Sequence, residues 1–157
     1  MPEKLLTATE LSEVVQRRRS RGERIVFTNG CFDLLHVGHI RFLQQARKLG
    51  DCLVVGLNSD ASVRGIKSGR PVITESQRAE VLAALSCVDH VVIFNAPDPH
   101  DLIQVLQPDV LVKGGDWPLD RIVGRDIVER RGGQVLSIPL IPDISTTILM
   151  ERIQKLS

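Results

Sequence analysis

The sequence predicts a single doubly wound α/β domain built on a parallel sheet, and three observations support this prediction. Short apolar runs alternate with amphipathic helical patterns along the chain. The clearest run, 52–57, is apolar on both faces of a strand, as in sheets that helices cover on both sides. Polar segments follow several of these runs. Together these features are typical of a Rossmann-like architecture, whose ligands bind beyond the carboxyl ends of the strands.

Each element is expected from a local pattern. The apolar runs predict strands at 25–28, 52–57, 91–94, 110–112 and 135–138. The amphipathic patterns predict helices at about 9–21, 38–49, 74–85, from 98–99 onward, 124–131 and 145–155. Gly50 and Gly132 end two of these helices, and a capping box at 74–77 opens another. Because no linker interrupts the pattern, residues 1–157 are interpreted as one domain, with a helix at about 9–21 ahead of a core at about 25–153.

Composition argues against several classes of protein. Lys and Arg total 20, Asp and Glu total 19 and the net charge is +1, so the basic excess of a nucleic-acid-binding protein is missing. The one basic cluster, 17–21, suits the end of a helix. No run approaches the ~20 apolar residues of a membrane span, and the chain starts without the apolar stretch of a signal peptide. Cys31, Cys52 and Cys87 form no CxxC pair, so we expect buried free thiols and a cytoplasmic location.

Polar segments follow four of the expected strands, at 28–30, 58–60, 113–116 and 143–147. Because the carboxyl ends of parallel strands meet at one edge of a sheet, these segments are expected to converge there. The sequence therefore predicts a binding site at this edge. Its chemistry has to be argued from the residues, because many functions share one fold.

The most specific motif is His36-Val37-Gly38-His39, at the start of an expected helix. The three-residue spacing places both imidazoles on one face of the first turn. Unpaired N–H groups and the helix dipole favour an anion there, and Gly38 lets a phosphate approach the backbone. Thr28-Asn29-Gly30 is expected to supply a tight turn and small donors just before it. The motif is neither a GxGxxG fingerprint nor a P-loop.

Two other interpretations of the histidine pair are open. Both side chains could be histidines with purely structural partners. They could also bind zinc, but no third ligand lies at a usual spacing and no HExxH is present.

Several cations accompany the motif. Lys113 directly follows a buried strand, where it can direct a charge at a phosphate or simply lie at the surface. Trp117 could stack on a base or sugar, or pack at the rim. Lys67 and Arg70 belong to a flexible loop that suits a lid over a triphosphate, and Arg78 lies early on the next helix.

Hydroxyls open the last expected helix. Ser145, Thr146 and Thr147 form either an anion site or an ordinary N-cap. Arg152, one to two turns further on, could reach the same phosphates.

No nucleophile or close carboxylate pair is evident among these residues. Donors and cations without a nucleophile favour in-line displacement at phosphorus. The attacking phosphate oxygen is already anionic at neutral pH, so the protein has only to position the substrates and stabilise charge. The sequence therefore predicts nucleotidyl transfer to a small phosphorylated molecule.

The chain resembles the cytidylyltransferase-like nucleotidyltransferases from Ile25 to about Ile153. Within them it is most similar to the D-glycero-β-D-manno-heptose 1-phosphate adenylyltransferases. The resemblance rests on the following segments: His36 to His39, Asn58-Ser59-Asp60, Lys67 to Arg78 with Gly69-Arg70-Pro71 inside it, Val112-Lys113-Gly114-Gly115-Asp116-Trp117 and Ile144-Ser145-Thr146-Thr147. The glycerol-phosphate cytidylyltransferases carry Arg-Thr-x-Gly before Ile-Ser-Thr-Thr, whereas this chain has Leu140-Ile141-Pro142-Asp143.

The resemblance implies that ATP and heptose 1-phosphate give ADP-heptose and pyrophosphate, with Mg²⁺, in a homodimer that serves lipopolysaccharide-core synthesis. Apart from a second copy of the chain, the expected partners are the small-molecule substrates, with no nucleic acid and no membrane. Transfer of a cytidylyl or adenylyl group to another small phosphate, such as glycerol 3-phosphate or phosphoethanolamine, is an alternative. A non-catalytic nucleotide sensor is another.

The family pattern and the physical arguments together assign roles. The residues expected to act on the reacting phosphates are His36, His39, Lys67 and Arg78. Those expected to bind the nucleotide are Thr28, Asn29, Gly30, Phe32, Gly38, Lys113, Ser145, Thr146 and Thr147. Asp116, Trp117 and Arg152 are expected at the substrate, Asp116 on a sugar hydroxyl. Asp33 is placed with them, as either a structural or a metal-linked residue. The metal ligands are unknown.

Overall fold

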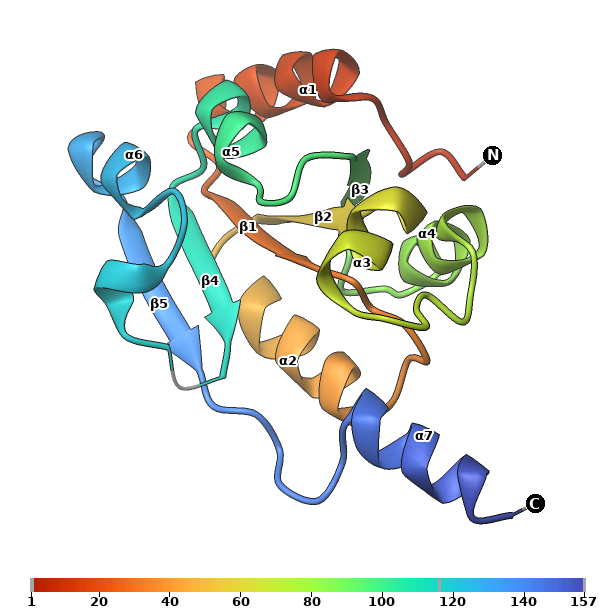
Figure 1. The fold of residues 1–157 in the computed structure, drawn as a ribbon. Helices are drawn as coiled ribbons and strands as arrows, with labels where there is room; N and C mark the ends of the chain where they lie inside the picture. The colour runs from red at the N-terminus through yellow and green to blue at the C-terminus, as the bar shows by residue number, and fades with distance from the viewer. Residues whose placement is uncertain (1, 116, 157) are drawn as a thin grey trace.

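A five-stranded parallel sheet forms the centre of the computed structural model, which describes residues 2–115 and 117–156. The strands are β1 (Ile25–Gly30), β2 (Cys52–Asn58), β3 (His90–Phe94), β4 (Val110–Gly114) and β5 (Gln134–Ile138), in the order β3-β2-β1-β4-β5 (Figure 1). Every residue of β2 is buried. The expected doubly wound α/β architecture is therefore confirmed.

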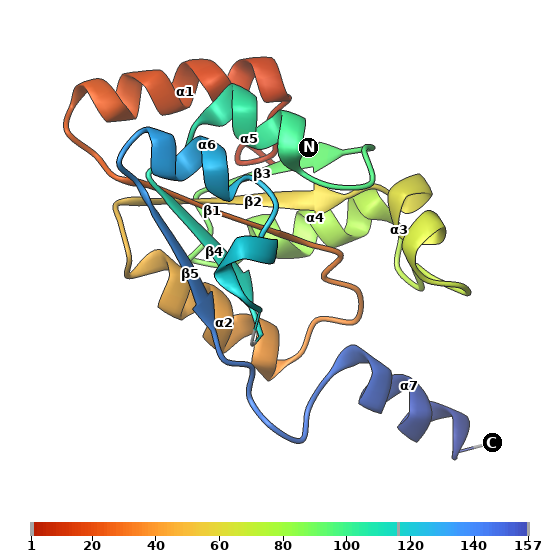
Figure 2. The same cartoon turned by 60° about the vertical axis from the view of Figure 1, so that its left-hand side comes forward.

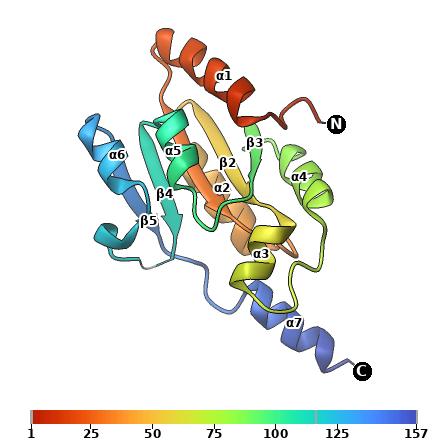
Figure 3. The same ribbon diagram turned by 45° about the horizontal axis from the view of Figure 1, so that its top comes forward.

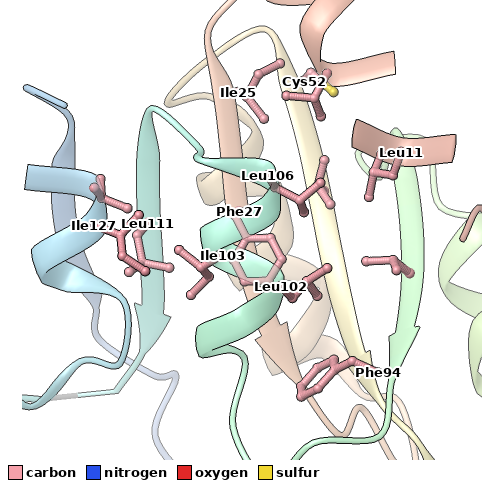
Figure 4. Close-up of a cluster of buried hydrophobic side chains, with 14 of the residues drawn as sticks. Leu11, Ile25, Phe27, Cys52, Phe94, Leu102, Ile103, Leu106, Leu111 and Ile127 are labelled. Carbon is pink, nitrogen blue, oxygen red and sulfur yellow. The ribbon is translucent and has the colours of Figure 1, made fainter. Parts of the chain in front are cut away.

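Helices cover both faces of the sheet (Figure 1). One face packs against α1 (Ala8–Ser20), α5 (His100–Leu106) and α6 (Arg125–Arg130). Figure 4 shows the buried hydrophobic cluster on this face, with Leu11, Phe27 and Ile103 among its members. The other face packs against α2 (Val37–Arg47) and α4 (Glu75–Ala83). Two layers of helix thus enclose an almost wholly aliphatic core.

The remaining helices lie near the carboxyl edge of the sheet (Figure 3). They are α3 (Asp60–Ile66), the short 3₁₀ helix η1 (Leu119–Arg121) and α7 (Thr146–Gln154). The helix α7 extends away from the body, and none of its residues is buried (Figure 2). No helix within the described ranges combines the length and the apolar character that crossing a membrane requires.

Local chemistry explains where the elements begin. Thr7 and Glu10 form a reciprocal capping box at α1. Gly50 fits the turn into β2 because a Cβ there would lie 2.7 Å from the carbonyl oxygen of Arg24. Asp98 accepts the N–H of His100 at the start of α5, so part of the expected cap is present.

The structure corrects the sequence predictions in several places. Thr74 precedes α4 but makes no side-chain capping bond, so the expected capping box at 74–77 is not formed. Residues 28–30 are the end of β1 rather than a turn. Neither α3 nor the bridge that pairs Leu5 with Val91 was expected.

The sheet opens between β1 and β4, which is where the strand order reverses direction. Strand β1 stays paired with β2 as far as Gly30, opposite Leu57. Its pairing with β4 reaches only Phe27, opposite Leu111. Beyond this point the two strands separate, which creates the crevice where doubly wound folds bind their ligands.

Candidate active site

A cavity of about 500 Å³ occupies this crevice. Its walls come from β1, β4, the start of α2, the end of α3, the segment before α5 and the residues around η1. The lining residues are Asn29, Gly30, Cys31, Phe32, Asp33, His39, Phe42, Asn58, Ile66, Lys67, Arg70, Pro97, Asp98, Pro99, Leu111, Val112, Lys113, Gly114, Trp117, Arg121, Ile122, Val123, Leu140 and Thr146. The cavity thus joins all four polar segments that the sequence placed at this edge, through Asn29, Asn58, Lys113 and Thr146 among others.

The two histidines of the motif bind the backbone of the first turn of α2. His36 is the N-cap, and its Nδ1 accepts the N–H of Gly38 at 3.0 Å. The N–H of His36 donates to Nδ1 of His39 at 3.2 Å. The two imidazole rings stack with their centroids 3.8 Å apart, and the ring centroid of Phe32 lies 5.4 Å from that of His39. The pair is therefore oriented before any ligand binds.

This arrangement decides which nitrogen carries the hydrogen. A neutral imidazole has one donor and one acceptor nitrogen, and both Nδ1 atoms accept here, so the hydrogens lie on Nε2. Burial lowers the pKa of His36. Burial, together with the nearby His36 and Lys67, lowers the pKa of His39 to about 4. Both imidazoles are therefore neutral with the hydrogen on Nε2. His39 lines the cavity, where this donor can meet an anion, whereas His36 stacks on His39 and is not among the lining residues.

Cations surround the same cavity. Lys113, at the end of β4, has its pKa lowered by burial, and its Nζ lies 5.4 Å from the centre of the Trp117 ring. Lys67 lies at the end of α3, close enough to influence both His39 and Lys113 electrostatically. Arg70 and Arg121 also line the walls. This charge distribution suits a polyanion such as a nucleoside triphosphate.

Arg78 occupies a different place from the expected one. Its side chain is only 1% exposed and forms an ion pair with Asp60 at 2.8 Å. The guanidinium also donates to the carbonyl oxygens of Cys31, Asn58 and Ile73. Because protein groups accept from each of its three guanidinium nitrogens, Arg78 links these segments and does not line the cavity, where a phosphate would bind. This corrects its assignment to the reacting phosphates.

Thr28 and Gly38 also need correction. Thr28 is wholly buried and does not line the cavity, so its side chain cannot contact a nucleotide there. A Cβ on Gly38 would lie 2.8 Å from Cε1 of His36. The missing side chain of Gly38 therefore makes room for the imidazole, rather than for a phosphate as expected.

The hydroxyls at the start of α7 are engaged by protein groups, one in a cap and two in contacts with distant segments. Ser145 accepts the N–H of Ile148 at 3.1 Å, Thr146 donates to the carbonyl oxygen of Asp33 at 2.8 Å, and Arg70 donates to Thr147 at 3.3 Å. Of the three hydroxyl residues, only Thr146 lines the cavity. Arg152 is exposed on α7 and does not line the cavity, so the structure does not bring it to the site.

The carboxylate of Asp33 lies against backbone rather than open space. It accepts the N–H groups of Val72 and Ile73 at 2.8 and 3.0 Å, and the residue is 3% exposed. Within 2–115 and 117–156, no group of three His, Cys, Asp or Glu side chains is arranged to hold a metal ion. The expected role of Asp116 on a sugar hydroxyl concerns a residue outside the described ones.

Sequence reasoning missed several lining residues. Residues 98–99 were interpreted only as a helix start and Pro97 was given no role, although all three follow β3 at the carboxyl edge, where the fold predicts ligand contacts. Asn58 was recognised as part of a polar segment but was given no role. Arg121 and Leu140 carry no sequence signal, because only the folded chain brings them to the crevice.

Comparisons with known proteins agree with this architecture. Residues 27–152 match the family described as cytidylyltransferase-like. The bifunctional protein HldE of Syntrophotalea carbinolica is 54% identical over 96% of this chain, and HldE of Geotalea uraniireducens is also 54% identical over 96%. The chain spans only 31% of the length of each of these relatives.

A solved structure is similar as well. The lipopolysaccharide core biosynthesis protein from Thermoplasma volcanium superposes with a TM-score of 0.63 at 29% sequence identity, over 76% of this chain and 98% of that one. The family match, the crevice at the strand reversal and the histidine pair on α2 lead to one conclusion: the chain belongs to the cytidylyltransferase-like family of nucleotidyltransferases.

Proposed function

We propose that the protein transfers the adenylyl group of ATP to D-glycero-β-D-manno-heptose 1-phosphate, which yields ADP-heptose and pyrophosphate. The observation that carries the proposal is the neutral Nε2–H donor of His39, which lines one cavity together with Lys67 and Lys113 and is held in place by the stacked His36. Donors and cations of this kind stabilise charge at a reacting phosphate.

The reaction is an in-line displacement. An oxygen of the sugar phosphate forms a bond to the α-phosphorus of ATP while the bond from that phosphorus to the bridging oxygen breaks. Pyrophosphate leaves with the electron pair. The attacking oxygen is anionic at neutral pH, so no base has to remove a proton, in keeping with two histidines whose pKa values are lowered.

The heptose acceptor and the adenine base are supported by resemblance. The segments Asn58-Ser59-Asp60 and Ser145-Thr146-Thr147 are similar to those of the heptose 1-phosphate adenylyltransferases. The relatives named HldE and the structural neighbour named for lipopolysaccharide core biosynthesis agree with this choice. Because the chain spans 31% of those relatives, only this one transfer reaction is proposed for it.

Three further properties belong to the same proposal. Mg²⁺ accompanies ATP as part of the substrate, since this ion is commonly held by phosphates and water. The roles proposed for Asn29, Gly30 and Phe32 are to line the nucleotide pocket, and Trp117 is proposed to stack on a base or sugar. A homodimer in the cytoplasm completes the proposal.

The test is pyrophosphate release with Mg²⁺, ATP or CTP, and a panel of phosphorylated acceptors. The panel contains heptose 1-phosphate, glycerol 3-phosphate and phosphoethanolamine. Turnover confined to ATP and the heptose supports the full proposal. Turnover with CTP or with another acceptor keeps the reaction class and overturns the substrate, and tight ATP binding without any release favours a nucleotide sensor.

A further inference from the structure

Asp33 lines the cavity and connects three separate segments there. Its carboxylate holds the backbone N–H groups of Val72 and Ile73, and its carbonyl oxygen accepts the hydroxyl of Thr146 at the start of α7. Asp33 itself belongs to the loop between β1 and α2. One residue therefore ties the loop before α4 and the first turn of α7 to the end of the central strand.

The loop that Asp33 holds carries two cations of the site. Residues 67–71 connect α3 to the anchored pair Val72 and Ile73, and Lys67 and Arg70 both line the cavity. The first end is fixed by the bond from the N–H of Lys67 to the carbonyl oxygen of Val63, at 2.8 Å. Only a short stretch lies between two fixed ends, so the anchors limit where the cations can be.

The second end of this loop, at Ile73, is bound by two side chains. Asp33 binds the N–H of Ile73 at 3.0 Å, and Arg78 binds its carbonyl oxygen at 2.9 Å. Arg78 also donates to Cys31, two residues before Asp33, at 2.7 Å. The link to α7 is doubled in the same way, because Arg70 of the loop donates to Thr147 beside Thr146.

A direct role for Asp33 at the substrate conflicts with this geometry. Its two carboxylate oxygens already accept charge-assisted hydrogen bonds, and the residue is 3% exposed. A free carboxylate in the wall would also repel the phosphates that Lys67 and Lys113 attract. The role of the carboxylate is therefore better explained by the backbone N–H groups of Val72 and Ile73 that it binds.

On the basis of the proposed function, we infer that Asp33 is a positioning residue. It sets Lys67 and Arg70 in the wall of the cavity by anchoring the loop, and it couples this loop to α7 without binding substrate or Mg²⁺.

The first test is amide hydrogen exchange, which needs no activity. In the wild-type protein, Val72 and Ile73 should exchange more slowly than Ser68 and Gly69 of the same loop. Asp33→Asn should speed exchange at Val72 and Ile73 by about 10-fold or more, the size expected when a charge-assisted bond is lost. Fast exchange of both amides in the wild type would overturn the inference even if the variant fails to fold.

Asp51→Asn is a matched control. Asp51 also accepts one backbone N–H, that of Arg24 at 2.7 Å, but it precedes β2 at the opposite edge of the sheet. This variant should leave exchange at Val72 and Ile73 and the Michaelis constant for ATP within about 2-fold of wild type.

The second test is a double-mutant cycle on pyrophosphate release. Asp33→Asn should lower kcat/KM for ATP by about 10-fold in the wild type, but by less than about 2-fold when Lys67 and Arg70 are both alanine. The Mg²⁺ concentration for half-maximal rate should not change. Additive losses, or a need for about 10-fold more Mg²⁺, would show instead that Asp33 acts directly on the substrate or the metal. Absence of wild-type turnover would reject the proposed function, while the exchange measurement would still decide the anchoring.

Discussion

The imidazole rings of His36 and His39 stack on the first turn of α2 with their centroids 3.8 Å apart and their planes inclined by 30°. Each Nδ1 accepts a backbone N–H, so the helix start itself fixes both tautomers. The same two side chains thus cap the helix and keep their Nε2–H groups as hydrogen-bond donors.

Replacing His39 by alanine should lower kcat by on the order of 10²–10³, the scale for losing one transition-state donor. The fold should remain, at the cost of about 1 kcal/mol for the lost cap. Steady-state pyrophosphate release and thermal unfolding measure the two effects. His100→Ala is the control, because His100 is exposed and lies outside the cavity lining. Near-native turnover of the His39 variant would remove His39 from the chemistry.

The histidine pair should also make stability depend on pH. Unfolded His39 takes up a proton near pH 6.5, whereas in the folded protein its pKa is lowered to about 4. The unfolded state therefore binds more protons between these values, and the free energy of unfolding falls as the pH decreases from 6.5 to 4. Urea unfolding at several pH values should show a smaller fall for His39→Asn than for the wild type. An NMR titration that puts His39 near 6.5 would contradict this prediction.

Adding one methyl group at Gly38 should disturb the site without disturbing the fold. The Cβ of Gly38→Ala would lie 2.8 Å from Cε1 and 2.9 Å from Nδ1 of His36, so the ring has to move. We expect kcat to fall by about 10-fold, because donors act only when well placed. Gly65→Ala on α3 is the matched control. A Cβ there meets nothing within 4 Å, so this change should leave kcat intact and stabilise by about 0.5–1 kcal/mol. Equal effects of the two variants on kcat would refute the steric argument.

Lys113→Met should weaken the interaction with ATP without lowering the thermal stability of the protein. Burial lowers the pKa of Lys113, which means that its charge is costly in the folded protein. The variant should unfold at the same or a higher temperature, while the Michaelis constant for ATP rises by about 10-fold or more. Lys48→Met, at the exposed far end of α2, should change neither. A clear loss of thermal stability in Lys113→Met would mean that the charge serves the fold.

The sheet and the histidine motif could be predicted from sequence because their signals are local. An apolar run such as 52–57 predicts a buried strand, and the spacing of His36 and His39 predicts that both lie on one face of a helix. The helix α3 was missed because Asn58, Ser59 and Asp60 have the composition of a loop, although Ser59 in fact caps the helix.

The errors concern contacts between distant parts of the chain. Arg78 was expected to act on the reacting phosphates because it follows the basic loop and belongs to a segment that resembles the family pattern. Its carbonyl partners Cys31 and Asn58 lie 47 and 20 residues away in sequence, where no local pattern records them. The buried position of Thr28 and the engaged carboxylate of Asp33 were hidden for the same reason.

The early separation of β1 and β4 has a consequence for how the protein responds to its ligand. Past Phe27 and Leu111 each strand still has a neighbour on its outer side, but its inner edge faces the other across the crevice. An edge of this kind normally occurs at the margin of a sheet, and here it lies in the middle. A ligand bound between the two edges would contact both strands and bridge them. Ligand binding should therefore reduce the motion of the two halves of the sheet relative to each other.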